Sequence, residues 1–182
     1  MDVKEIYDAR ERLKGHIKET PIVYAPNLGE DVYLKVEVLQ ETGSFKLRGA
    51  YNKIATLTDE EASKGVVACS AGNHAQGVAK SATERGISSI ICMPYHAPLS
   101  KVKATKNYGA EVELVRDSFD DAAAYAQKLS REEGYTFIAP FDDEKVIAGQ
   151  GTIGLEILEK IPDLDIIVVP IGGGGLISGI AL

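Results

Sequence analysis

Apolar and polar positions along the chain repeat with two periods, which predicts both helices and strands. Apolar residues at helical spacing predict an amphipathic helix over residues 3–17. Across residues 32–38 apolar and polar side chains alternate one by one, which is typical of a half-buried strand. Ser44 closes the next turn and is the predicted N-cap of a helix over residues 45–57.

From residue 65 onward, short apolar runs alternate with helical patterns. We predict strands over 65–70, 89–94, 111–115, 135–139 and 165–170, and helices over 73–85, 98–108, 120–133, 144–161 and from Leu176 onward. Strands that alternate with helices over short loops form a parallel sheet covered by helices on both faces. The predicted fold class is therefore α/β, with a parallel sheet flanked by helices.

Composition and charge narrow the class of protein. The 182 residues are 45% hydrophobic and 26% charged, as expected of a globular protein of one domain or slightly more. Acidic residues outnumber basic ones, 27 to 20, and no basic stripe appears, so we expect no nucleic-acid partner. The longest apolar run, residues 166–176, contains Pro170 and four glycines and is too short to cross a membrane.

Cysteine and histidine positions indicate neither disulfides nor zinc. Cys69 and Cys92 lie in apolar runs and are predicted to be buried, reduced thiols. The three histidines lack metal-ligand spacing, so no zinc site is predicted, although a site made of carboxylates is left open. The charged N-terminal segment lacks the apolar core of a signal peptide, and we expect a cytoplasmic protein.

Glycines cluster at Gly172, Gly173, Gly174 and Gly175, between a predicted strand and a predicted helix. Exposed backbone N–H groups at a helix start bind anions, so the segment is a candidate phosphate cradle, the alternative being a flexible turn. Residues 149–154 match G-x-G-x-x-G, but no apolar strand leads directly into them. We interpret residues 149–154 as part of a helix that packs closely on its neighbours.

The segment Ser70-Ala71-Gly72-Asn73-His74 lies between a predicted strand and a predicted helix. Its N–H groups, hydroxyl and amide could bind a carboxylate. In a second hypothesis Ser70 is a hydrolase nucleophile, which would require His96 and Glu84 as partners. In a third, Asn73 simply caps the helix and His74 is exposed.

Lys46 falls in the first turn of a predicted helix, where a cation is disfavoured by the helix dipole. The dipole and burial both lower the pKa of a lysine, which is how an amine becomes a nucleophile toward carbonyls. The neighbouring Phe45 could cover a flat ring. The alternative is a solvated surface lysine.

Three of these segments together resemble a known family. Residues 41–50, 70–74 and 172–176 closely resemble signatures of threonine dehydratase and serine racemase, which are pyridoxal-phosphate enzymes of fold type II, the tryptophan-synthase-β type. Residues 146–152 are also similar to that family. The resemblance covers the whole chain, and residues 67–70 favour the catabolic threonine dehydratase branch.

The resemblance implies a role for each motif. Lys46 would hold pyridoxal 5'-phosphate as a Schiff base, and its freed amine would remove the α-proton of the amino acid. The product of L-threonine or L-serine would be a 2-keto acid and ammonia. Phe45 would pack near the cofactor ring, Asn73 would bond its phenolic oxygen, Gly172, Gly173, Gly174, Gly175 and Leu176 would cradle its phosphate, and Ser70, Ala71, Gly72, Asn73 and His74 would bind the substrate carboxylate.

The resemblance also implies a division into domains. Residues 1–48 and 142–182 would form part of a large cofactor domain, and residues 49–141 a small α/β domain inserted into it. Family members are much longer, and the chain ends about two turns into a helix, so we expect the N-terminal half of such an enzyme. Expected partners are an amino-acid substrate, further copies of the chain and a polypeptide that supplies the C-terminal half. Serine racemase activity and a non-catalytic α/β fragment that binds at most a phosphate are the alternatives.

Overall fold

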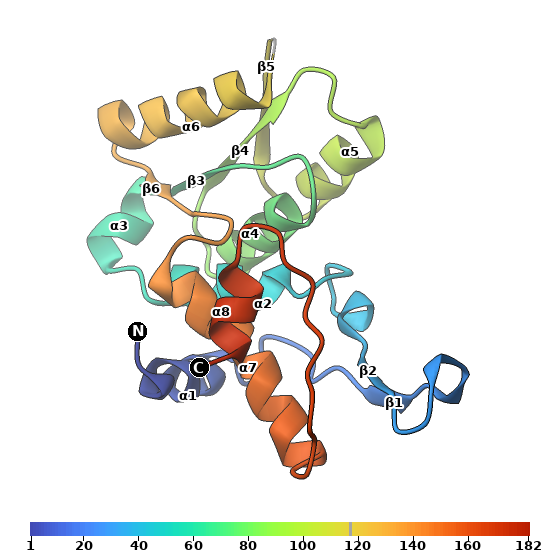
Figure 1. Ribbon diagram of the computed structural model, residues 1–182. Coiled ribbons are helices and arrows are strands. Elements are labelled where there is room, and N and C mark those ends of the chain that lie inside the picture. The colour runs from blue at the N-terminus through green and yellow to red at the C-terminus, as the bar shows by residue number, and fades with distance from the viewer. Residues whose placement is uncertain (117) are drawn as a thin grey trace.

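The computed structural model describes residues 1–116 and 118–182. Its elements form a parallel sheet with covering helices and a second group of helices below it (Figure 1). The α-helices are α1 Val3–Leu13, α2 Lys46–Ala55, α3 Asp59–Lys64, α4 Asn73–Glu84, α5 Leu99–Asn107, α6 Phe119–Glu133, α7 Glu144–Lys160 and α8 Gly175–Ile180. The strands are β1 Ile22–Tyr24, β2 Tyr33–Lys35, β3 Val66–Cys69, β4 Ser89–Pro94, β5 Glu111–Val115 and β6 Thr136–Phe137, and two 3-10 helices are η1 Pro26–Leu28 and η2 Glu37–Leu39.

The main sheet has four parallel strands in the order β5-β4-β3-β6. Successive side chains of β3 point to opposite faces, as the strand period requires. Val66 and Ala68 pack toward α4, whereas Val67 and Cys69 pack toward α6. The predicted parallel sheet with helices on both faces is therefore confirmed. Cys69 and Cys92, paired across β3 and β4, are buried free thiols as predicted.

The second group is built around α7, which contacts α1, α2 and α8. Its glycines allow these helices to approach closely. A Cβ atom on Gly149 would lie 2.6 Å from the Arg48 carbonyl oxygen, and one on Gly151 would lie 2.6 Å from the Gly179 carbonyl oxygen. The prediction that residues 149–154 are a packing segment of a helix is confirmed. Because α2 contacts both α4 and α7, it joins the two groups.

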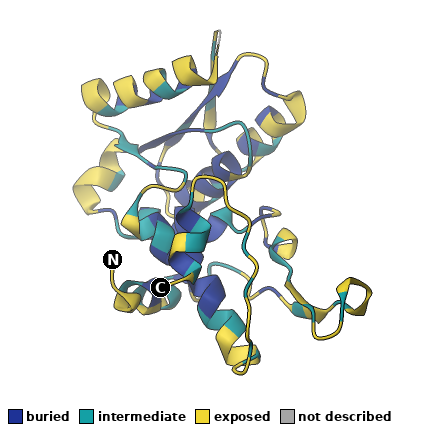
Figure 2. Cartoon of the chain, viewed as in Figure 1, coloured by how far each residue is buried: buried dark blue, intermediate teal, exposed yellow. Residues whose placement is uncertain are grey.

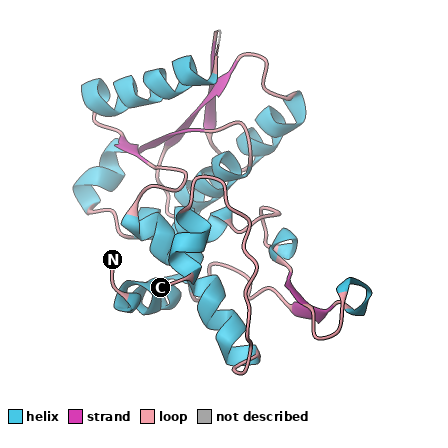
Figure 3. Cartoon of the chain, in the orientation of Figure 1, coloured by secondary structure: helices cyan, strands magenta, loops and turns pink. Residues whose placement is uncertain are grey.

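The predicted strand over residues 165–170 is wrong. The segment is extended, but it pairs with no strand in the described part of the chain. It runs as a long loop along the helix group (Figure 3), and much of it is exposed (Figure 2). Ile166 and Val168 are 80% and 90% exposed. An apolar sequence becomes a strand only where a neighbouring backbone offers a ladder of hydrogen bonds. No such backbone lies beside this segment among residues 1–116 and 118–182.

Two predictions near the N-terminus are corrected. The helix expected over residues 3–17 ends at Leu13, because Lys14 leaves the helical region and Gly15 has φ +80°. The strand expected over residues 32–38 is reduced to β2, which pairs antiparallel with the unpredicted β1. It is not half-buried in the expected way, since Leu34 is 46% exposed. No second layer covers this two-stranded ribbon in the described residues.

The start of α2 also differs from the prediction. Phe45 precedes the helix in a helical conformation, and Ser44 does not act as its cap. The Ser44 hydroxyl is buried without a hydrogen-bond partner in the described part of the chain. Helix α3 was not predicted, although Thr58 and Glu61 form a capping box, which is a signal visible in the sequence.

Candidate active site

Lys46 is the first residue of α2 and faces the loop that follows β6. Its Nζ donates a hydrogen bond of 2.5 Å to the carbonyl oxygen of Pro140. Nζ also lies 5.4 Å from the ring centre of Phe45 and 6.0 Å from that of Phe141. The amine is thus held between two aromatic rings and a neutral carbonyl.

The surroundings of Lys46 favour its neutral form. Burial of the side chain lowers its pKa below the ordinary value of 10.5. No carboxylate forms an ion pair with this amine among the described residues. A lysine in this condition can act as a nucleophile or a base, which a solvated surface lysine does poorly at neutral pH.

A cavity of about 270 Å³ opens beside this amine. That size is near the lower end of small-molecule sites, which span about 300–1,000 Å³. The cavity is mostly apolar and lies between the start of α2, the loop after β6 and the glycine loop before α8. Its lining residues are Phe45, Lys46, Pro140, Phe141, Gln150, Pro170, Ile171, Gly172, Gly173, Gly174, Gly175 and Leu176.

The glycine loop is open on one side and packs against Phe141 on the other. A Cβ atom on Gly172 or Gly174 would meet nothing within 4 Å, so the loop is open on that side. On Gly173 or Gly175 it would collide with Phe141, so the loop lies closely against that residue. Gly174 has φ +89°, a conformation that glycine adopts readily. A half-buried amine and an uncovered backbone loop on one cavity fit a flat aldehyde that carries a phosphate.

The segment of residues 70–74 lies at the end of β3 and the start of α4 but does not line this cavity. The Ser70 Oγ accepts a hydrogen bond of 3.2 Å from the Gly72 N–H, and Asn73 is exposed. His74 is only 3% exposed, and its Nε2 lies 2.9 Å from the Ile138 carbonyl oxygen. The alternative in which Asn73 caps α4 and His74 is exposed is wrong, since Gly72 is the N-cap residue.

The hydrolase hypothesis finds no geometric support among the described residues. Glu84 pairs with His16 at 2.5 Å and lies 3.6 Å from Lys80, and it makes no contact with Ser70 or His96. His96 is exposed in the loop after β4. Ser70, Glu84 and His96 therefore form no catalytic triad.

Sequence reasoning missed Pro140, Phe141 and Gln150 as cavity residues. Pro140 and Phe141 follow the carboxyl end of β6, and ligands of parallel α/β sheets bind at that edge. That rule could have predicted Pro140 and Phe141 as cavity residues from the sequence. Gln150 gave no such signal, because its side chain is buried within α7 and accepts a hydrogen bond from the Gly49 N–H.

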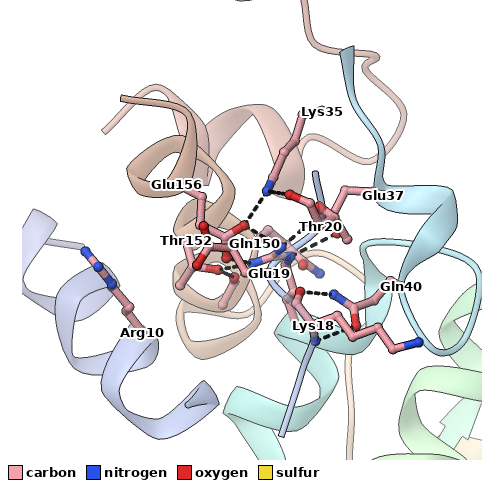
Figure 4. A network of polar contacts seen from close by, with 12 residues as sticks. Arg10, Lys18, Glu19, Thr20, Lys35, Glu37, Gln40, Gln150, Thr152 and Glu156 are labelled. Carbon is pink, nitrogen blue, oxygen red and sulfur yellow. Dashed lines mark hydrogen bonds and ion pairs between the residues drawn. The ribbon is translucent and has the colours of Figure 1, made fainter. Parts of the chain in front are cut away.

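A buried network of charged side chains surrounds Arg48, on the side of α2 that faces away from the Lys46 cavity. The guanidinium is fully buried and bonds the carboxylates of Glu37 and Glu156, with its shortest contacts at 2.8 Å and 2.5 Å. Lys35 donates to Glu156 at 2.5 Å and to the Thr20 carbonyl at 2.6 Å. Figure 4 shows Lys35, Glu37 and Glu156 of this network converging from separate elements. Sequence reasoning assigned no role to Arg48.

Neither a metal site nor a membrane segment is found in the described residues. No group of three or more His, Cys, Asp or Glu side chains is placed to hold a metal ion there. No described helix is both long and apolar enough to span a membrane.

Comparison with known proteins identifies the family. The family described as "Pyridoxal-phosphate dependent enzyme" matches residues 13–182. The chain belongs to this family. It is 52% identical to the L-threonine ammonia-lyase of Thermotoga maritima, over 99% of this chain and 46% of that protein. It is 53% identical to the catabolic L-threonine dehydratase TdcB of Escherichia coli K12, over 99% of this chain and 56% of that protein.

Solved structures agree with this membership of the pyridoxal-phosphate enzymes. The fold matches serine racemase from maize with a TM-score of 0.95 and 41% identity, over 99% of this chain and 56% of that one. The predicted fold class of a fold type II enzyme is therefore confirmed. The chain spans about half the length of the curated relatives it matches.

Proposed function

We propose that this chain is the N-terminal half of a pyridoxal-phosphate-dependent lyase that converts L-threonine, and L-serine, to a 2-keto acid and ammonia. The observation that carries the proposal is the half-buried amine of Lys46, which faces a neutral carbonyl and shares a cavity with a bare glycine loop. We choose L-threonine as the substrate because relatives at 52% and 53% identity are named L-threonine ammonia-lyase and L-threonine dehydratase.

Residues around the cavity would hold the cofactor. Lys46 would bind it covalently through Nζ, Phe45 would pack against its ring, and residues 172–176 would hold its phosphate through backbone N–H groups. Asn73 would bond the ring oxygen from the start of α4. When bound, pyridoxal phosphate supplies a conjugated ring that spreads the charge left on the substrate α-carbon after its proton is removed.

The chain's own groups would then handle the proton and the substrate. The Lys46 amine, whose pKa is lowered by burial, accepts the α-proton at Nζ. Backbone N–H groups of residues 70–74, at the start of α4, bind the substrate carboxylate. The rings of Phe45 and Phe141 lie beside the amine and contribute to its burial, which lowers its pKa.

The first experiment is to trap the cofactor on the chain. The purified chain is mixed with pyridoxal phosphate and reduced with borohydride, and the labelled residue is found by mass spectrometry. We expect one adduct, on Lys46, and its complete loss in Lys46→Ala, while the control Lys103→Ala on exposed α5 keeps it. An adduct that persists at the same level in Lys46→Ala would refute the assignment, and no adduct at all would favour a fragment that binds at most a phosphate.

Serine racemase activity is the second candidate, and the fit to the maize enzyme at a TM-score of 0.95 favours it. Product analysis separates the two activities. The chain is combined with a polypeptide carrying the second half of such an enzyme and supplied with L-serine. A 2-keto acid and ammonia indicate the lyase, whereas D-serine without keto acid indicates the racemase.

The partner and domain assignments belong to this proposal. We propose that a second polypeptide half covers the extended segment 162–171, whose Ile166 and Val168 side chains are exposed. Residues 1–48 and 142–182 would then complete a large domain around the small domain of residues 49–141.

We also propose that the chain forms a homo-oligomer, which sedimentation can measure. The surface that would support it consists of exposed apolar residues of β1, β2 and η2: Val23, Tyr24, Tyr33, Leu34, Val38 and Leu39. Two buried free thiols suit the reducing cytoplasm.

A further inference from the structure

His74 and Lys46 bond two carbonyls of the same short segment. The His74 Nε2 lies 2.9 Å from the Ile138 oxygen, and the Lys46 Nζ lies 2.5 Å from the Pro140 oxygen. Ile138 and Pro140 are only two residues apart in the loop that follows β6. Residues 138–140 thus form a shared support for the first turn of α4 and the amine at the start of α2.

The support is itself anchored in the sheet. The Ile138 N–H donates a 2.8 Å hydrogen bond to the Val67 oxygen of β3, and the Ile138 side chain is fully buried in the core. The two helices also meet directly, because a Cβ atom on Gly77 of α4 would lie 3.2 Å from the Lys46 carbonyl oxygen. His74 therefore adds a side-chain hydrogen bond to the contacts that join α2, α4 and residues 138–140 around Lys46.

The hydrogen bond defines the form of the imidazole. Because the Ile138 oxygen can only accept, the ring proton is on Nε2 and the lone pair is on Nδ1. Nδ1 is buried and has no hydrogen-bond partner in the described part of the chain. Burial lowers the pKa of His74 to about 4; the bond to Ile138 opposes this shift and the charge of Lys46 adds to it. A protonated ring would place an unpaired N–H donor in this buried site, so the ring stays neutral.

We propose that His74 is a positioning residue, which ties the segment of residues 70–72 to the support that holds the Lys46 amine. The proposal rests on the proposed function, in which residues 70–74 bind the substrate carboxylate. In this role His74 transfers no proton and touches the substrate only through its backbone. Its imidazole sets the distance between the carboxylate-binding loop and the amine.

The first test uses the unmodified chain without cofactor. Nitrogen-15 NMR of the histidine rings reports which nitrogen carries the proton. We expect His74 to show one tautomer, with the proton on Nε2, and no titration between about pH 5.5 and pH 8. A ring that titrates near the ordinary histidine pKa, or that carries its proton on Nδ1, would overturn the proposal.

The second test compares two variants. His74→Gln keeps an N–H donor at the position of Nε2, whereas His74→Leu leaves the Ile138 carbonyl without a partner. We expect His74→Leu to weaken borohydride-trapped cofactor binding about tenfold or more, and His74→Gln to stay within about threefold of the unmodified chain. His96→Gln, on an exposed loop, is the matched control with no effect.

A third measurement needs no cofactor and separates the two proposals. The pH at which Lys46 becomes half reactive toward a small acylating reagent should rise in His74→Leu and be restored in His74→Gln. Without the hydrogen bond from His74 to Ile138, water reaches the amine and its pKa moves back toward the ordinary value. Equal behaviour of both variants and the unmodified chain would refute the positioning role. If the unmodified chain traps no cofactor while NMR and acylation behave as expected, the proposed function fails, and only the structural link from His74 to the segment that holds Lys46 is supported.

Discussion

Lys46 and Arg48 are two cations two residues apart on one helix, and their surroundings are opposite. The Arg48 guanidinium is fully buried, and carboxylates of Glu37 and Glu156 hold it in a closed network. The Lys46 amine is half-buried, beside a cavity, and its hydrogen-bond partner is a neutral carbonyl.

The pKa shifts express the same contrast. Burial acts to lower the pKa of Arg48, but hydrogen bonds and charges of Glu156 and Glu37 outweigh it and raise the pKa. Burial lowers the pKa of Lys46 without such opposition. A cation that is compensated by carboxylates stays charged and serves the fold, whereas an uncompensated one is available for proton transfer and bond formation.

The largest effect is expected when the network loses its guanidinium. In Arg48→Met the Glu37 carboxylate loses its ion pair with Arg48, and the Glu156 carboxylate keeps its ion pair with Lys35. Removing one partner of a buried ion pair costs about 3–5 kcal/mol. We expect the free energy of unfolding in urea to fall by that amount. The elements at risk are α7 and the η2 region, which Arg48 joins to α2.

Arg10→Met is the matched control for that loss. Arg10 pairs with Glu159 at the surface, where the two side chains are 34% and 48% exposed, and such pairs contribute about 0–1 kcal/mol. If Arg48→Met and Arg10→Met lower the free energy of unfolding equally, the contrast between a structural cation and a reactive one is wrong.

Filling the cavity should change binding and leave the network intact. In Gly173→Ala the new methyl group collides with the Phe141 ring, so the loop or the ring must move. We expect trapped cofactor binding to weaken about tenfold or more, with little loss of stability. Lys103→Ala, exposed on α5, is the control, and an unchanged affinity in Gly173→Ala would argue against a shape requirement at Gly173.

The smallest effect is a pH dependence at Lys46. Its pKa is lower in the folded chain than the ordinary value of 10.5, so between the two values the unfolded chain binds more protons. The contribution of Lys46 to stability therefore rises as pH increases through that window. We expect the stability difference between the chain and Lys46→Met to change in this direction in urea unfolding at several pH values, and a constant difference would show that the amine is solvated.

Much of the fold could be predicted from the residues in order. The helix and strand alternation from Val66 to Lys160 follows from local periodicity, and the sheet needs only the general rules for parallel strands. The strand expected at 165–170 failed because a strand exists only beside a partner. The exposed ribbon of β1 and β2 differs from its prediction for a related reason, since no layer of the described part of the chain covers it.

The motifs likewise indicated which residues could carry the chemistry, but not how those residues are arranged in space. Local sequence was enough to single out Lys46, the segment of residues 70–74 and the glycine loop, because helix starts and clustered glycines have recognisable residue patterns. Their roles toward cofactor and substrate stay predictions. The bonds from Lys46 to Pro140 and from His74 to Ile138 join residues 94 and 64 positions apart.

By itself, then, the sequence determined the α/β class, the family and the segments that carry chemistry, because each depends on neighbours along the chain. The tertiary structure decided which of two nearby cations is paired. It brought Glu37 and Glu156 to Arg48 and a neutral carbonyl to Lys46, from elements 11, 108 and 94 residues away. The reactivity of a side chain depends on its burial and on the charges around it, and these exist only once distant segments have packed together.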